Sequence, residues 1–106
     1  MADRVTTLAS QQAVVIFGSS NCHMCHAVHT LFTDLGVSWM VHDLDKDPQG
    51  KDVKRVLAGM VGPARSSPLP AVFIGGALVG PTDRVMSLHV GGQLVPLLRQ
   101  AGALWL

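Results

Sequence analysis

An apolar and largely β-branched run, Ala13 to Phe17, stands out near the start of this short chain. Such a run predicts a buried strand, and a short helix is expected before it over 4–10. The run ends at Gly18-Ser19-Ser20-Asn21, a group of turn and cap formers, and helical spacing of apolar residues begins at Met24. The apolar positions of that helix are Ala27, Val28, Leu31, Phe32 and Leu35, with Gly36 suited to its C-terminal cap. The opening unit is therefore strand, turn, helix.

The rest of the chain completes one sheet. A second strand is expected over 37–44, parallel to the first because a helix lies between them. Asp47-Pro48 predicts a helix with proline at its first position and an apolar face of Val53, Val56, Leu57 and Met60. After a proline-rich loop over 62–70, a tight hairpin is expected around Gly75-Gly76, then helices over 83–89 and 93–101. The order predicts an α/β fold, a four-stranded mixed sheet flanked by helices, as a single domain over 1–106.

Charge and hydropathy exclude several classes of ligand. Lys and Arg total 8 and Asp and Glu total 7, so the formal net charge of the 106 residues is +1, and the basic residues are scattered. Direct contact with nucleic acid is therefore not expected. No segment approaches the roughly 18 apolar residues of a membrane span, and the start of the chain lacks the features of a secretory signal. We expect an intracellular protein without membrane contact.

Cys22 and Cys25 are the only cysteines, too few and too close together for a stabilising disulfide framework. Reactivity explains them better. Cys22 lies where the first strand leads into the helix, beside the amide groups and the positive dipole end that stabilise a thiolate. We therefore predict that Cys22 is the nucleophile and that Cys25, one turn further in, resolves a mixed disulfide. A protonated His23 would favour the thiolate further.

Other interpretations of the cysteine pair stay open. Cys22-x-x-Cys25-His26 matches a haem attachment motif, although a strand leading into it conflicts with helical wrapping of haem. Cys22, Cys25, His26 and His29 share a helical face and could offer zinc ligands, although structural zinc sites usually draw on two segments. An iron–sulfur cluster shared between subunits through Cys22, or two buried cysteines acting as small hydrophobes, are further alternatives. No metal is predicted, and His26 and His29 are expected on the solvent face of the helix.

Motifs along nearly the whole chain carry a resemblance to a known family. They are Val14 to Phe17, Cys22-His23-Met24-Cys25, Leu69-Pro70 before Ala71 to Gly76, and Gly80 to Asp83. Together they resemble the glutaredoxins of the thioredoxin-like superfamily. The resemblance implies a thioredoxin fold and a glutathione-dependent thiol-disulfide oxidoreductase using Cys22 and Cys25. It also implies a cis-proline at Pro70 facing the cysteines, glutathione paired with the backbone of Leu69, and its γ-glutamyl end held by Thr82 and Asp83 near a helix N-terminus.

The C-terminal sequence narrows the resemblance. A leucine-rich helix, 94–98, and the tail Ala103-Leu104-Trp105-Leu106 resemble the plant CC-type (class III, ROXY-like) glutaredoxins. That resemblance implies a tail over 103–106 that binds TGA-type bZIP transcription factors, redox regulation of those factors, and a location in cytoplasm and nucleus. Two alternatives accompany it: a non-catalytic adaptor that binds such factors through the tail, and a tail docked on the protein's own last helix. Leu94, Leu97 and Leu98 are expected on the core face of that helix.

Three positions depart from the family pattern. Ser19 stands where the family has a basic residue three positions before the nucleophile, His23 where CC-type members have a second cysteine, and Met24 where dithiol members have tyrosine. These departures bear on catalytic strength rather than on the fold.

Overall fold

A four-stranded mixed sheet forms the centre of the computed structural model, which describes residues 2–20, 22–62 and 69–103. The strands are β1 (Val14–Gly18), β2 (Met40–Asp43), β3 (Ala71–Ile74) and β4 (Ala77–Gly80), in the spatial order β2-β1-β3-β4. β1 is parallel to β2 and antiparallel to β3, which pairs antiparallel with β4. The expected sheet and its hairpin are confirmed.

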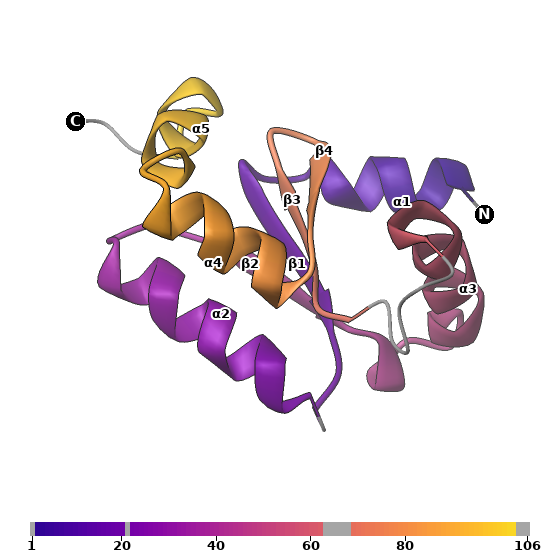
Figure 1. Cartoon of the computed structure of the whole chain (residues 1–106). Helices are drawn as coiled ribbons and strands as arrows, with labels where there is room; N and C mark the ends of the chain where they lie inside the picture. The colour runs from indigo at the N-terminus through magenta and orange to yellow at the C-terminus, as the bar shows by residue number, and fades with distance from the viewer. Residues whose placement is uncertain (1, 21, 63–68, 104–106) are drawn as a thin grey trace.

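Helices cover both faces of the sheet (Figure 1). One face carries α1 (Ala2–Ala9) and α3 (Gly50–Val61), and the other carries α2 (His23–Asp34), α4 (Thr82–Val90) and α5 (Leu94–Gln100). A short 3₁₀ helix, η1 (Leu44–Lys46), leads from β2 towards α3. This arrangement is the thioredoxin fold expected from the sequence.

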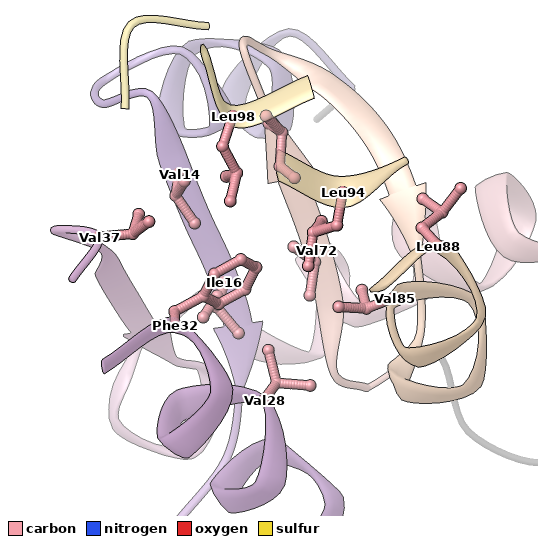
Figure 2. Close-up of a cluster of buried hydrophobic side chains, with 11 residues drawn as sticks. Val14, Ile16, Val28, Phe32, Val37, Val72, Val85, Leu88, Leu94 and Leu98 are labelled. Carbon is pink, nitrogen blue, oxygen red and sulfur yellow. The ribbon is translucent and has the colours of Figure 1, made fainter. Parts of the chain in front are cut away.

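Alternation along the central strands divides the core into two layers. Val14 and Ile16 of β1 pack under α2, α4 and α5, whereas Val15 and Phe17 pack under α1 and α3. Figure 2 shows the first layer, in which Phe32 of α2 lies beside Ile16 of β1 and Leu94 of α5 lies beside Val72 of β3. Leu94 and Leu98 are fully buried, which confirms them as the core face of α5, and Leu97 is partly buried. Because every residue of β1 is buried, this strand is the fixed centre of the fold.

Glycines in the left-handed conformation set how two helices end. Gly36 has φ +74°, and the amides of Gly36 and Val37 donate to the carbonyls of Thr33 and Phe32, which confirms the expected C-terminal cap of α2. Gly102 ends α5 in the same way with φ +79°, and the Ala103 amide donates to the Leu98 carbonyl at 2.8 Å. Ala103 is thereby turned back against the first core layer.

The boundaries around β2 and α3 differ from expectation. Only Met40 to Asp43 pairs with β1, because the capping turn of α2 occupies the residues before them. Pro48 is not the first residue of α3, since it lies in the turn between η1 and α3 and the helix begins at Gly50. Asp47 instead accepts a hydrogen bond from the Gln49 amide at 2.8 Å within the turn between the two helices. Met60 is 47% exposed, so the apolar face of α3 is shorter than its periodicity indicated.

Two histidines lie against aromatic rings. His29 was expected on the solvent face of α2, but its ring stacks on Trp39 with centroids 4.4 Å apart and its Nε2 atom is buried. His42 of β2 stacks on Phe17 at 5.4 Å. Burial lowers the pKa of both imidazoles, which favours their neutral forms. Within the described ranges, no helix is both long and apolar enough to span a bilayer.

Candidate active site

Four segments that are distant in sequence meet at one edge of the sheet. β1 and β2 end there because they are parallel, and β3 begins there because it runs opposite to β1. β4 returns to the same edge and leads into α4. The cysteine motif, Leu69-Pro70 and Thr82-Asp83 are therefore brought to a common edge, as the sequence motifs implied (Figure 1).

Cys22 caps the N-terminus of α2. Its backbone is extended, with φ −88° and ψ 105°, and its Sγ accepts a hydrogen bond from the Cys25 amide at 3.0 Å. A donor aimed at this sulfur from the first helical turn stabilises negative charge on it. The structure holds Cys22 and Cys25 as a disulfide, so their sulfurs lie within bonding distance of each other.

Cys25 is the inner member of the pair, as expected, and is only 2% exposed. Its sulfur lies directly over Gly18, where an added Cβ atom would come within 2.9 Å of Sγ. Gly18 has no left-handed conformation to explain it. The close approach of the Cys25 sulfur explains why a glycine is found at position 18. The grouping of Gly18 with the turn formers in the sequence did not predict this contact.

Pro70 faces the same position from β3. The Leu69–Pro70 peptide bond is cis, which confirms that expectation. Phe17 pairs with Ala71 at the end of the antiparallel ladder, and Gly18 and Pro70 are the residues that adjoin this last pair. Pro70 is buried and Leu69 is half-buried. The cis-proline is thus placed beside the glycine over which Cys25 packs.

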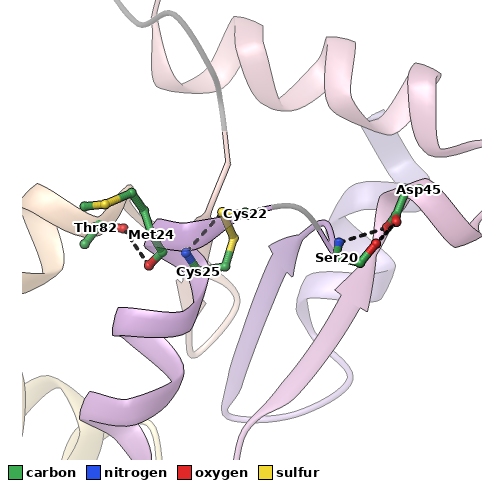
Figure 3. Close-up of a disulfide and its surroundings, with 6 residues drawn as sticks. All are labelled: Ser20, Cys22, Met24, Cys25, Asp45 and Thr82. Carbon is green, nitrogen blue, oxygen red and sulfur yellow. Dashed lines mark hydrogen bonds between the residues drawn. A yellow bond between two sulfur atoms is a disulfide. The ribbon is translucent and has the colours of Figure 1, made fainter.

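Thr82 begins α4 and reaches across to the cysteine motif. Its hydroxyl donates a hydrogen bond to the Met24 carbonyl at 3.3 Å, and the residue is 6% exposed (Figure 3). Asp83 is exposed at the same helix N-terminus, and the Met24 side chain is 55% exposed beside the cysteines. The Thr82 side chain therefore contacts the first turn of α2, between the two cysteines, which sequence reasoning did not predict.

Ser20 anchors the other side of the cysteine loop to η1. Its amide donates to Oδ1 of Asp45 at 3.2 Å and its hydroxyl donates to Oδ2 of the same carboxylate (Figure 3). The bond from the Ser20 hydroxyl is the main reason that the pKa of Asp45 lies below its usual range. Because 25 positions separate the two residues, no local sequence pattern indicated this contact.

A small cavity of about 180 Å³ lies beside this anchor. Ser19 and Leu69 line it from the sheet edge, and Lys51 and Lys54 line it from α3. Sequence reasoning missed these lysines as site residues. Their spacing of three positions on a predicted helix was a usable signal, because it places both ammonium groups on one face. Leu44, Asp45 and Gly50 complete the lining, so two ammonium groups and one carboxylate border a cavity that is mostly apolar.

The remaining predicted residues fall outside this cluster. Ala103 of the tail packs against the core below α5, and Leu104, Trp105 and Leu106 lie beyond the described residues. His26 is exposed on α2, as expected. Among the residues that the structure describes, no three His, Cys, Asp or Glu side chains are placed to share a metal ion.

Comparisons with known proteins give a consistent result. The family model described as Glutaredoxin matches residues 14–79. A rice (Oryza sativa subsp. japonica) protein named as a glutaredoxin-C2 is 74% identical over 106 residues, covering 100% of this chain and 83% of the relative. Rice Glutaredoxin-C1 is 61% identical over 103 residues, covering 97% of this chain and 98% of its own length.

Solved structures agree with the sequence relatives. The crystal structure of a buckwheat glutaredoxin–glutathione complex superposes with a TM-score of 0.88 at 32% identity, covering 97% of this chain and 91% of the other. The crystal structure of the holo form of glutaredoxin C1 from Populus tremula x tremuloides gives a TM-score of 0.85 at 35% identity, covering 93% and 95%.

The contact between Gly18 and Cys25 predicts a specific cost for a methyl group. Gly18→Ala should lower the free energy of unfolding by about 1–3 kcal/mol, because the new Cβ atom overlaps Cys25 Sγ in a buried site. The measurement is urea unfolding with the thiols reduced. Cys25→Ala in the Gly18→Ala background should recover most of the loss, because it removes the sulfur.

Gly59→Ala is the matched control. Gly59 is an exposed residue of α3 with open space at its Cβ position, so alanine there should stabilise by about 0.5–1 kcal/mol. If Gly18→Ala proved as benign as Gly59→Ala, the close approach would not constrain the site.

Proposed function

The chain belongs to the glutaredoxin family, alongside class III glutaredoxins of rice, and we propose that it is a glutathione-dependent thiol-disulfide oxidoreductase with Cys22 as its nucleophile. The main support for this proposal is the position of Cys22 at the N-cap of α2, where its sulfur accepts a hydrogen bond from the Cys25 amide. The buckwheat glutaredoxin solved with glutathione supports the co-substrate. A free thiol has a pKa near 8.5, and helix N-termini lower it to roughly 3.5–7.5, so the thiolate is the attacking species at neutral pH.

The proposed reaction begins on a protein–glutathione mixed disulfide. The Cys22 thiolate attacks the glutathione sulfur, a Cys22–glutathione disulfide forms, and the protein sulfur leaves as a thiolate that takes up a proton. A second glutathione thiolate then attacks the glutathione sulfur on Cys22, which releases oxidised glutathione and restores the Cys22 thiolate. Alternatively the Cys25 thiolate attacks Cys22 Sγ, which releases glutathione and leaves the Cys22–Cys25 disulfide.

Groups of the chain around Cys22 are placed to bind different parts of glutathione. We infer that the backbone of Leu69 beside cis-Pro70 pairs with the peptide, and that its γ-glutamyl carboxylate lies at the N-terminus of α4, at Thr82 and Asp83. Because the Thr82 hydroxyl donates to Met24, the main chain of α4 is the proposed contact there.

The cavity beside Leu69 suits the glycyl carboxylate. Its volume of about 180 Å³ is below the roughly 300–1,000 Å³ of pockets that hold a whole ligand, so it would take one end of the tripeptide. We infer that Lys51 and Lys54 supply the positive charge there, since Ser19 has none and the Asp45 carboxylate, which also lines the cavity, is bonded to Ser20.

A second function is proposed for the tail. Leu104, Trp105 and Leu106 are large apolar residues that follow the Gly102 cap, and Ala103 is anchored to the core where the tail begins. We propose that this tail binds TGA-type bZIP transcription factors, either to present their cysteines to Cys22 or as a non-catalytic adaptor. That role requires a location in the nucleus as well as the cytoplasm. A cluster-binding glutaredoxin is the less favoured alternative.

The nucleophile assignment predicts an asymmetric result for the two cysteines. Cys22→Ser should abolish reduction of a glutathionylated peptide, whereas Cys25→Ser should keep part of the activity, because glutathione can resolve the Cys22 intermediate without it. The measurement is a glutathione-coupled assay, with intact mass used to detect glutathione on Cys22 in Cys25→Ser. Wild-type activity in Cys22→Ser would refute the mechanism.

The proposed role of Lys51 and Lys54 predicts that their removal weakens substrate binding but does not slow the chemical step. Lys51→Ala combined with Lys54→Ala should raise KM for the glutathionylated peptide about tenfold, equivalent to roughly 1.4 kcal/mol of lost binding, with kcat nearly kept. Arg55→Ala is the control for loss of an α3 cation outside the cavity, to be compared with each single lysine variant as well, because its side chain is 82% exposed and pairs with Asp52. An unchanged KM in the double lysine variant would remove the carboxylate role.

The tail predicts a partner-binding defect that is separable from catalysis. A chain ending at Ala103 keeps the core contact of that residue, and we expect it to lose binding to a TGA-type factor in a fluorescence anisotropy titration while keeping peptide reduction. Val90→Ala removes an 86% exposed apolar side chain elsewhere and is the control. Binding equal to that of the full chain would eliminate the tail's role. Unchanged binding by Cys22→Ser would favour the adaptor over redox exchange.

A further inference from the structure

The turn that leads into Cys22 is held from outside by one carboxylate. The Cys22 amide donates to the Ser19 carbonyl at 3.1 Å, which closes a turn that contains Ser20. Asp45 accepts both the amide and the hydroxyl of Ser20, so it fixes the main chain and the side chain of that residue together. In Figure 3 this contact lies on one side of the cysteines, and the contact between Thr82 and Met24 lies on the other.

Asp45 is itself placed by a tight junction. Leu44, the preceding residue, is buried in the second core layer, and the Asp47 amide donates to its carbonyl at 3.3 Å. The backbone of Gly50 passes so close that an added Cβ atom would lie 1.8 Å from the Leu44 carbonyl oxygen. η1 therefore has little freedom to move relative to α3, and its carboxylate offers Ser20 a rigid acceptor.

We propose that Asp45 is a positioning residue of the thiol site, which acts through Ser20 to hold Cys22 in its N-cap conformation. The proposal rests on the proposed function of Cys22 as nucleophile. The thiolate at Cys22 depends on its sulfur facing the Cys25 amide and the first turn of α2, and that orientation is set by the turn from Ser19 to Cys22. The same anchor holds Ser19 at the edge of the cavity lined by Lys51 and Lys54.

Two alternative physical roles of Asp45 predict opposite shifts in the pKa of Cys22 when Asp45 is removed. If Asp45 acted only as a nearby negative charge, its removal would lower the pKa of Cys22, because a like charge disfavours the thiolate. If it acts by holding the turn, its removal should raise the pKa of Cys22, because the sulfur spends less time at the N-cap. Ser20→Ala separates the two, since it weakens the anchor and leaves the charges of Asp45, Lys51, Lys54 and His23 in place.

The experiment uses the full chain with Cys25→Ser, so that Cys22 is the single thiol. Its pKa is read from the pH dependence of iodoacetamide alkylation by intact mass, which needs neither glutathione nor turnover. We expect Asp45→Asn and Ser20→Ala each to shift the midpoint upward by about half a pH unit, or about threefold less thiolate below the midpoint. Ser20→Thr, which keeps the hydroxyl, should restore the original midpoint.

Asp52→Asn is the matched control, because Asp52 is an exposed carboxylate of α3 that pairs with Arg55. Its midpoint should not change. A lower midpoint in Asp45→Asn, or an unchanged midpoint in Ser20→Ala, would overturn the proposal. Ser20→Ala alters an exposed side chain and supplies the test even if Asp45→Asn folds poorly. Loss of peptide reduction in Cys22→Ser tests the nucleophile separately, so the two failures are distinguishable.

Discussion

Strand β1 is buried on both faces and paired on both edges, and the positions of all the site groups follow from it. Its side chains alternate between the two core layers, so a shift of one residue would exchange both layers at once. Its register with β2 pairs Gly18 with Asp43, and its register with β3 pairs Phe17 with Ala71, the residue that follows Pro70. The end of β1 thus determines where the cysteine turn, η1 and the cis-proline lie.

Beyond the end of β1, the segment that contains Cys22 is held by contacts at two positions. Asp45 holds Ser20 before Cys22, and Thr82 holds the carbonyl of Met24 after it. Both contacts join residues that are far apart in sequence, and each comes from an element that also borders the proposed glutathione site. The segment that carries the two cysteines is therefore held between the two ends of the proposed glutathione site.

The parts of this arrangement that local chemistry decides could be predicted from sequence. The buried run at β1, the periodicity of α2, the Gly36 cap and the Gly75-Gly76 hairpin all appear where expected. The cis bond before Pro70 followed from the family resemblance. Boundaries near α3 were wrong because Pro48 lies in a turn that brings the Gly50 backbone against the Leu44 carbonyl, a close approach that helix-start signals do not encode. His29 was misplaced because Trp39, from beyond the helix, offers it a ring to stack on.

Contacts that decide the chemistry were the least visible in sequence. The pairing of Asp45 with Ser20 and the lysine-lined cavity exist only once α3 has packed beside the end of β1. Ser19, considered alone, indicated the loss of a basic partner for a carboxylate of glutathione. The fold places two cations beside that same position from another helix, so a departure at one residue is a poor measure of the charge at the site.

In the proposed mechanism Cys22 carries the thiolate, and the main chain and the side chain of Cys25 act on it in different ways. Stabilisation of Cys22 comes from the Cys25 main-chain amide, whereas Cys25 Sγ is buried over Gly18. The electrostatic part of the site therefore does not require the second sulfur. That sulfur adds a resolving group in the proposed mechanism, because Cys25 is only 2% exposed and its sulfur lies within bonding distance of Cys22 Sγ. In the proposed mechanism, activation of Cys22 belongs to the helix, and only the choice between resolution by glutathione and resolution by Cys25 belongs to the second thiol.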